Sequence, residues 1–125
     1  MENISHLAPI LAVRDMKKAL TFYNEIGFKT EFLWQDPPSY AVLSGGGSAS
    51  IHLSLLDPAH RGQKTKGVIY VFVHNVDQLY EECLEKGSSI AEGIATRDYG
   101  MRDFEILDPD GNLLTFGTRA ELLSK

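Results

Sequence analysis

An internal repeat is the feature that most constrains this chain. The stretch at 13–27, VRDMKKALTFYNEIG, is followed 60 residues later, at 73–87, by VHNVDQLYEECLEKG, with no gap between the two copies' positions. Few positions are identical, but the physical order is the same: an apolar strand end, an aspartate or asparagine, an apolar stripe and a final glycine. Two copies of one supersecondary unit in a short chain predict a fold of two similar modules.

The repeated segments predict two helices. Apolar residues recur at helical spacing over 16–26 and again over 76–86. Asp15 is suited to cap the first helix, and Asn75, followed three residues later by Gln78, resembles a capping box for the second. A glycine follows each segment, where a helix commonly ends in left-handed backbone.

Apolar runs and turn signals predict four strands in each half. These strands are 7–13, 29–35, 40–43 and 50–56 in the first half, and 68–73, 89–95, 101–107 and 112–117 in the second. The run at 68–73 is continuously apolar, which predicts burial on both faces. The chain is therefore predicted to be one α+β domain over 1–125, with module one at about 1–57, a linker at 58–66 and module two at about 67–120.

Composition and charge limit the kinds of molecule that we expect this protein to bind. A formal net charge of −5 argues against nucleic acid and is compatible with a cationic ligand. No apolar run approaches the ~20 residues needed to cross a bilayer, so no membrane partner is expected. The lone Cys83 excludes an internal disulfide and is predicted to lie in the core. The N-terminal stretch lacks the pattern of a secretory signal, and we expect a cytoplasmic protein.

Several motifs occur in an order typical of one superfamily. PILAVRD at 9–15 opens the first module, VDQLY at 76–80 starts the second helix, and YGMRDF at 99–104 precedes the turn DPDGN at 108–112. Together they resemble the vicinal oxygen chelate superfamily of glyoxalases, bleomycin-resistance proteins and dioxygenases, with the closest likeness to the bleomycin-resistance proteins. The resemblance implies two βαβββ modules related by a pseudo-two-fold, curved mixed sheets enclosing a cavity, and a homodimer.

The same resemblance implies four positions for a metal in the metal-dependent members. Aligned on this chain, they are Ala8, His52, Val68 and Thr115. Ala8 and Val68 carry no donor atom, and a threonine is a poor ligand for a divalent ion. A catalytic metal usually needs about three protein ligands. We therefore expect no metal, no cofactor and no catalytic residues of the usual glyoxalase kind.

Strand alternation from these positions gives most of a predicted ligand-binding set, to which Tyr99 adds flat apolar surface. Trp34 joins the set through the resemblance, because it stands where aromatic residues of bleomycin-resistance proteins meet the drug. The members of the set are Trp34, His52, Tyr70, Phe72, Tyr99, Met101, Asp103, Glu105 and Thr115. The aromatic members could equally be plain core, and Trp34 could be core or interface. Asp103 or Glu105 could act with His52 as an acid–base pair, but pairing with Arg102 or a lysine at the rim is favoured.

Three functions compete. The first is a metal-free binding protein that sequesters an aromatic or cationic molecule in a dimer cleft, a bleomycin-type drug being one such ligand by resemblance. The second is a glyoxalase-like lyase or another enzyme of unknown substrate that uses His52 with an acidic neighbour. The third is a regulatory or structural domain. Sequestration needs affinity and no chemistry, so the missing metal ligands favour the first.

Overall fold

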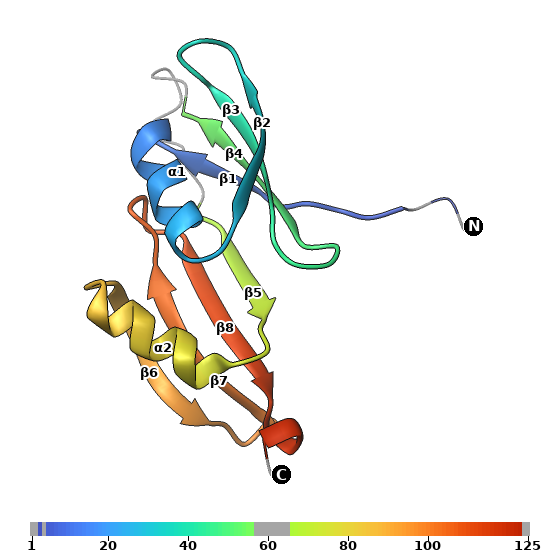
Figure 1. Ribbon diagram of the computed structural model, residues 1–125, viewed down its shortest axis with the longest axis vertical. Helices are drawn as coiled ribbons and strands as arrows, with labels where there is room; N and C mark the ends of the chain where they lie inside the picture. The colour runs from blue at the N-terminus through green and yellow to red at the C-terminus, as the bar shows by residue number, and fades with distance from the viewer. Residues whose placement is uncertain (1–2, 4, 57–65, 124–125) are drawn as a thin grey trace. The chain divides into compact units, whose positions relative to one another are not determined.

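The computed structural model describes residues 3, 5–56 and 66–123, in two compact units, Met1–Gly67 and Val68–Lys125 (Figure 1). Unit 1 holds β1 (Ile10–Val13), α1 (Met16–Glu25), β2 (Lys29–Trp34), β3 (Tyr40–Ser44) and β4 (Ser50–Leu55). Unit 2 holds β5 (Val68–Phe72), α2 (Val76–Glu85), β6 (Ser89–Thr96), β7 (Met101–Leu107), β8 (Leu113–Arg119) and the short 3-10 helix η2 (Ala120–Leu123). Of the linker predicted at 58–66, residues 58–65 lie outside the described residues.

The two units have the same topology. The strand order is β1-β4-β3-β2 in unit 1 and β5-β8-β7-β6 in unit 2. In each, the first strand pairs in parallel with the last, and the other pairs are antiparallel. The predicted α+β fold of two βαβββ modules is thereby confirmed. The first strand is shorter than predicted and leaves Ala8 just outside it.

The local signals that predicted the helices are realised at their ends. The backbone N–H of Lys18 donates to the Asp15 carboxylate at 3.0 Å, and that of Gln78 donates to the Asn75 side chain at 3.1 Å. The glycines that follow the helices have φ of +114° and +74°. The capping box differs in one contact, because the Gln78 side chain accepts from the Asn75 side chain rather than from its backbone. Neither helix is long and apolar enough to cross a membrane.

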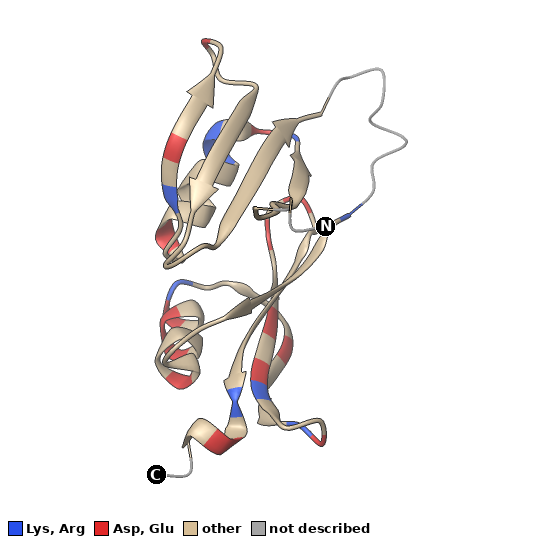
Figure 2. Ribbon diagram, turned by 90° about the vertical axis from the view of Figure 1, so that its right-hand side faces the viewer, with Lys and Arg blue, Asp and Glu red and all other residues tan. Residues whose placement is uncertain are grey.

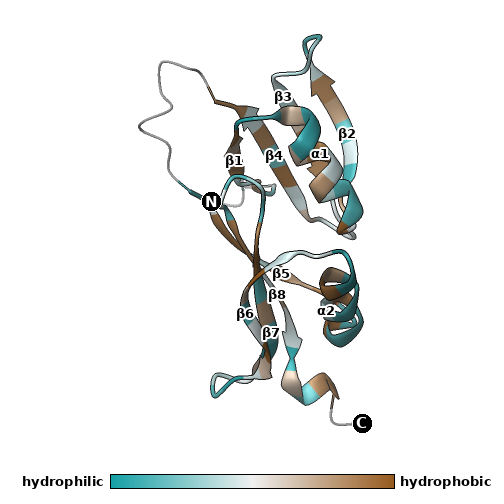
Figure 3. Cartoon of the chain, turned by 90° about the vertical axis from the view of Figure 1, so that its left-hand side faces the viewer, coloured by the Kyte–Doolittle hydropathy of each residue, from teal (hydrophilic) through white to brown (hydrophobic). Residues whose placement is uncertain are grey.

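Each unit has its own core between one helix and one face of its sheet. In unit 1, alternate strand residues such as Leu11, Leu43 and Leu53 are buried, and Tyr23 of α1 is fully buried with its ring edge-on to Phe28. Figure 3 shows these apolar bands in brown on the strands and helix. The alternation follows from the strand period of two.

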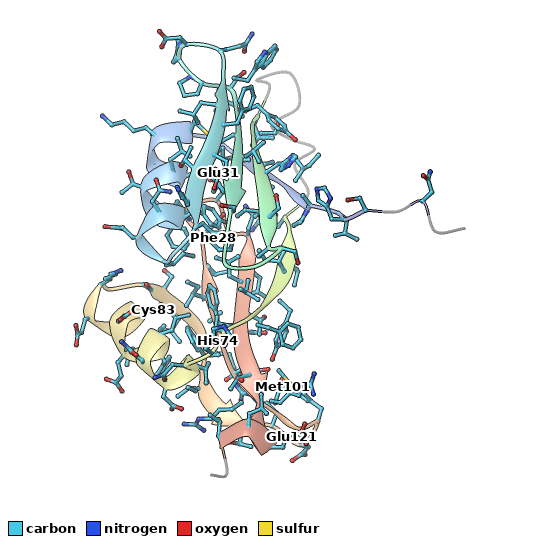
Figure 4. All side chains as sticks on the ribbon, turned by 45° about the vertical axis from the view of Figure 1, so that its right-hand side comes forward. Phe28, Glu31, His74, Cys83, Met101 and Glu121 are labelled. Carbon is cyan, nitrogen blue, oxygen red and sulfur yellow. The ribbon has the colours of Figure 1, made fainter. Side chains whose placement is uncertain are left out.

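The core of unit 2 is aromatic. Phe104 and Phe116 are fully buried on neighbouring strands with ring centroids 5.6 Å apart, and Tyr80 of α2 packs on Phe104 at 5.0 Å. Cys83, labelled in Figure 4, lies on α2 and is buried in the core, as predicted. Burial raises the pKa of its thiol, which suits a packing role.

The prediction that the apolar run of β5 is buried on both faces is wrong. Val68 and Phe72 are 69% and 70% exposed, whereas Ile69 and Val71 between them are half-buried. The physical reason is the layer order: α2 covers one face of the sheet, so the side chains of alternate β5 residues point away from that core. The exposed face is the one that carries most of the predicted ligand residues.

Candidate ligand-binding site

The face of the second sheet opposite α2 gathers predicted site residues from three strands. The register places Phe72 beside Gly117 and Gly117 beside Asp103. Two residues along each strand, Tyr70 lies beside Thr115 and Thr115 lies beside Glu105. Neighbours in register share a face of a sheet, so these side chains form one surface.

Asp103 is the centre of this surface. It is 2% exposed, and its two carboxylate oxygens accept from three side chains. The hydroxyls of Tyr70 and Tyr99 each donate to Oδ2 at 2.8 Å. Arg97 donates from Nε to Oδ1 at 2.9 Å, and its Nη2 donates to the carbonyl oxygens of Gly93 and Asp103 at 2.7 and 3.0 Å. The buried charge is therefore paired and hydrogen-bonded, as such a charge must be.

These contacts fix the protonation states of the cluster. Burial acts to raise the pKa of Asp103, but the hydrogen bonds from Arg97, Tyr99 and Tyr70 outweigh it and hold the pKa below its usual value. Burial and the bond to Asp103 raise the pKa of Tyr70, and the bond to Asp103 raises that of Tyr99. The carboxylate is charged and the two phenols are neutral at ordinary pH.

Gly117 makes room for this arrangement. A Cβ atom at this position would lie 2.2 Å from the Tyr70 hydroxyl oxygen and 2.8 Å from the Cβ of Asp103. Both distances are far below van der Waals contact, so only glycine lets the tyrosine cross the strand to reach the carboxylate. A glycine inside a strand often marks such a close approach.

Aromatic surface is exposed beside this cluster. Tyr70, Phe72 and Tyr99 are 38%, 70% and 68% exposed, and the Tyr70 and Phe72 ring centroids are 5.0 Å apart. Met101, labelled in Figure 4, is half-buried at the start of β7, two residues before Asp103 and so on the same face. Flat apolar groups with a fixed polar centre are typical of small-molecule sites.

Acidic groups border the aromatic surface. Glu105 lies directly opposite Glu92 of β6, and the two share this face. Thr115 is 7% exposed, and its hydroxyl donates to Glu105 at 3.4 Å. Figure 2 shows acidic residues in red on the strands of this unit and on α2. The surface therefore carries negative charge outside the neutralised Asp103–Arg97 pair.

The remaining predicted residues lie on the corresponding face of unit 1. Trp34 is 55% exposed beside Tyr40, and His52 lies beside Val42 and Ile10. The Tyr40 hydroxyl and Nδ1 of His52 are 2.6 Å apart, with the two rings edge-on. Trp34 is thus on the surface of this unit rather than in its core.

The residues at the four implied metal positions do not fit a divalent ion. His52 on β4 is the one good donor among these four; the Thr115 hydroxyl is engaged by Glu105, and Ala8 and Val68 have no donor. Within 3, 5–56 and 66–123, no group of three or more His, Cys, Asp or Glu side chains is arranged to hold a metal. These side chains therefore provide no basis for a metal-dependent step.

The ion pair predicted for Asp103, with Arg102 or a lysine, is wrong. Asp103 pairs with Arg97, while Arg102 forms a salt bridge with Asp77 of α2 at 2.8 Å. Arg102 lies one residue from Asp103 and therefore on the opposite face of the strand. Arg97 was missed because its place follows from the hairpin register: its backbone N–H donates to the Met101 carbonyl oxygen, which puts Arg97 on the face of Asp103.

Unit 1 also has a cavity of about 620 Å³ that extends along α1. It is lined by α1 and by Pro37, Pro38 and Leu55. Neither Trp34 nor His52 is among its lining residues, so this cavity and the predicted ligand residues of unit 1 are separate.

Comparisons with known proteins agree with the fold. A family model described as Glyoxalase/Bleomycin resistance protein/Dioxygenase superfamily matches residues 3–116. TioX from Micromonospora sp. ML1 is 20% identical with a TM-score of 0.80, over 92% of this chain and 98% of that one. A superfamily member from Sphaerobacter thermophilus is 26% identical with a TM-score of 0.77, over 93% and 98%. An integron cassette protein from V. Cholerae is 25% identical with a TM-score of 0.70, over 94% and 98%. A search of curated proteins found no match.

Proposed function

Since the chain belongs to the Glyoxalase/Bleomycin resistance protein/Dioxygenase superfamily, we propose that it binds a small aromatic or cationic molecule and sequesters it without a metal and without transforming it. A bleomycin-type drug, with planar rings and a cationic tail, is one ligand of this kind. Sequestration requires a surface of the right chemistry and no reacting group.

One observation supports the proposal most. Tyr70, Phe72 and Tyr99 present ring surface to the outside while their polar neighbour, Asp103, is almost completely buried. Aromatic rings stack on such faces, and cations bind them with about 0.5–2 kcal/mol each. If these side chains served only to pack the fold, the rings would be buried and the carboxylate would face water.

We expect measurable binding of planar cations. Calorimetric titration with bleomycin and with a simpler planar aromatic cation should give a Kd below about 1 mM, and Phe72→Ala should weaken it by about tenfold because a stacking face is lost. Leu84→Ala is the matched control, since Leu84 is an exposed apolar residue of α2, 47% exposed, and belongs to no predicted site. Equal losses in the two variants, or no binding, would contradict the proposal.

The enzyme alternative draws support from the Tyr40–His52 pair. A tyrosine hydroxyl 2.6 Å from Nδ1 fixes the imidazole ring and leaves Nε2 outside that hydrogen bond. The titrated ligand should therefore be recovered and weighed by mass spectrometry. A change in its mass that disappears in His52→Ala would replace sequestration by catalysis; an unchanged mass supports sequestration.

We further propose that the protein is a homodimer. The side chains of Ile10, Phe32 and Trp34 are 62%, 53% and 55% exposed, and exposed apolar patches of this kind commonly mark protein interfaces. A standard interface of about 1,600 Å² would suffice. Light scattering at micromolar concentration should report twice the 13.9 kDa of the chain. A single 13.9 kDa species under those conditions would refute the dimer.

A further inference from the structure

We propose that the second unit selects ligands that donate hydrogen bonds, and that Asp103 is the positioning residue which imposes this selectivity. The proposal rests on the binding function above and names its ligand class: a planar aromatic cation whose charge carries N–H groups, such as an amidinium, a guanidinium or a primary ammonium. Ligands whose polar groups only accept, such as carboxylates and phosphates, are excluded.

The first step in the argument is the direction of two phenol protons. A tyrosine hydroxyl has one hydrogen to donate and two lone pairs that accept. Tyr70 and Tyr99 both give that hydrogen to Oδ2 of Asp103, at 2.8 Å each. The hydroxyl oxygens therefore have only lone pairs to offer a ligand that meets the exposed rings.

The second step is that Asp103 cannot reverse this direction. An ionised carboxylate accepts and never donates. Arg97 holds it in that state by donating to Oδ1 at 2.9 Å, and Asp103 is 2% exposed. Gly117 keeps Tyr70 within reach of the carboxylate, because any side chain there would collide with the hydroxyl. The acceptor character of the phenols is thus built into the fold.

The third step is the neighbouring charge. Glu92 and Glu105 lie directly opposite each other on β6 and β7, and like charges in that relation are destabilising. A ligand cation beside them would offset this repulsion. Arg97, the cation of the cluster, is occupied by Asp103 and by the Gly93 carbonyl oxygen. The surface thus offers phenol lone pairs, ring faces and two carboxylates. This combination fits a cation that donates N–H hydrogen bonds.

Three fluorescent or absorbing compounds separate the contributions. 6-Amidino-2-phenylindole is a planar monocation with amidinium N–H groups, thioflavin T is a planar monocation without N–H groups, and 2-phenylindole is the neutral parent of the first compound. We expect the first to bind about tenfold more tightly than the second, because a charge-assisted hydrogen bond is added. Asp103→Asn should bring that ratio close to one, since an amide can donate to the phenols and turn their protons outward. Glu105→Gln, the matched control, should weaken both cations and leave the ratio unchanged.

A spectroscopic measurement tests the cluster without any ligand. Ultraviolet titration at the phenolate band should show Tyr70 and Tyr99 ionising at higher pH in the native protein than in Asp103→Asn, because their bonds to the carboxylate raise the pKa of both phenols. Equal titrations would overturn the inference while leaving the binding function intact, as would a native ratio near one or a ratio that survives Asp103→Asn. If bleomycin binds and Tyr70→Phe does not alter its affinity, the inference again fails alone. If none of the compounds nor bleomycin binds below about millimolar, the binding function and the inference fail together.

Discussion

Replacing Phe104 by alanine is expected to lower the free energy of unfolding by about 3–5 kcal/mol, the cost of a large buried cavity. Phe104 is fully buried, and its ring contacts Tyr80 at 5.0 Å and Phe116 at 5.6 Å between centroids. These neighbours come from α2 and β8, so the cavity would open where helix and sheet meet. Urea unfolding at a fixed protein concentration measures the change.

Phe72→Ala is the control for this prediction, since it removes the same side chain from the opposite face of the same sheet. Phe72 is 70% exposed, and its truncation should alter stability by no more than about 0.5 kcal/mol. Comparing the two variants thus distinguishes a residue that packs in the core from one whose ring is available to a ligand. Similar losses in both variants would mean that Phe72 is buried in solution, by a partner or otherwise, and would refute its role as open surface.

Gly117→Ala should cost about 3 kcal/mol, from overpacking and from the loss of a hydrogen bond to a buried carboxylate. Its new methyl group would lie 2.2 Å from the Tyr70 hydroxyl oxygen, so the phenol must leave Asp103. The same unfolding experiment detects the loss, and it should be accompanied by a lower pKa for the displaced tyrosine.

Two variants locate the cause. In a background of Tyr70→Phe, Gly117→Ala should cost less, because the nearest clashing atom is gone; the contact with Asp103 at 2.8 Å leaves the rescue partial. Gly93→Ala is the matched glycine, since a Cβ there meets only the Tyr80 hydroxyl, at 3.4 Å. An equal cost at both glycines, or no rescue, would show that the close approach of Tyr70 is not the reason.

The parts of the fold that were predictable from the sequence are those with local causes. Asp15 and Asn75 cap helices through residues three positions away, and the stripes that follow repeat within one or two turns. The repeat at an offset of 60 residues then predicted that the helix and strands of one module recur in the other. Strand ends were less well predicted: β1 begins at Ile10, opposite His52, although β4 extends back to Ser50, and β1 ends at Val13, opposite Leu55, the last residue of β4.

The misassigned features depend on layer order and on distant partners. Val68 and Phe72 are as apolar as Ile69 and Val71, and nothing in the run itself says that one face lacks a helix. Arg102 is adjacent to Asp103 in the sequence and Arg97 is six residues away, yet the hairpin register places Arg97, and not Arg102, on the face of Asp103. Pairwise choices of this kind require the three-dimensional register that a single sequence leaves open.

The parallel pairing of the first strand with the last sets the order in which each unit can form during translation. β1 pairs with β4, with Ile10 opposite His52, so the ribosome must add about forty residues before β1 has its neighbour. At about 5–20 residues per second this interval lasts roughly 2–8 s. The same delay recurs in unit 2, where β5 waits for β8. Each nascent module therefore spends seconds with an unpaired apolar strand, a period in which chaperones or a neighbouring nascent chain can bind that strand before its own partner is made.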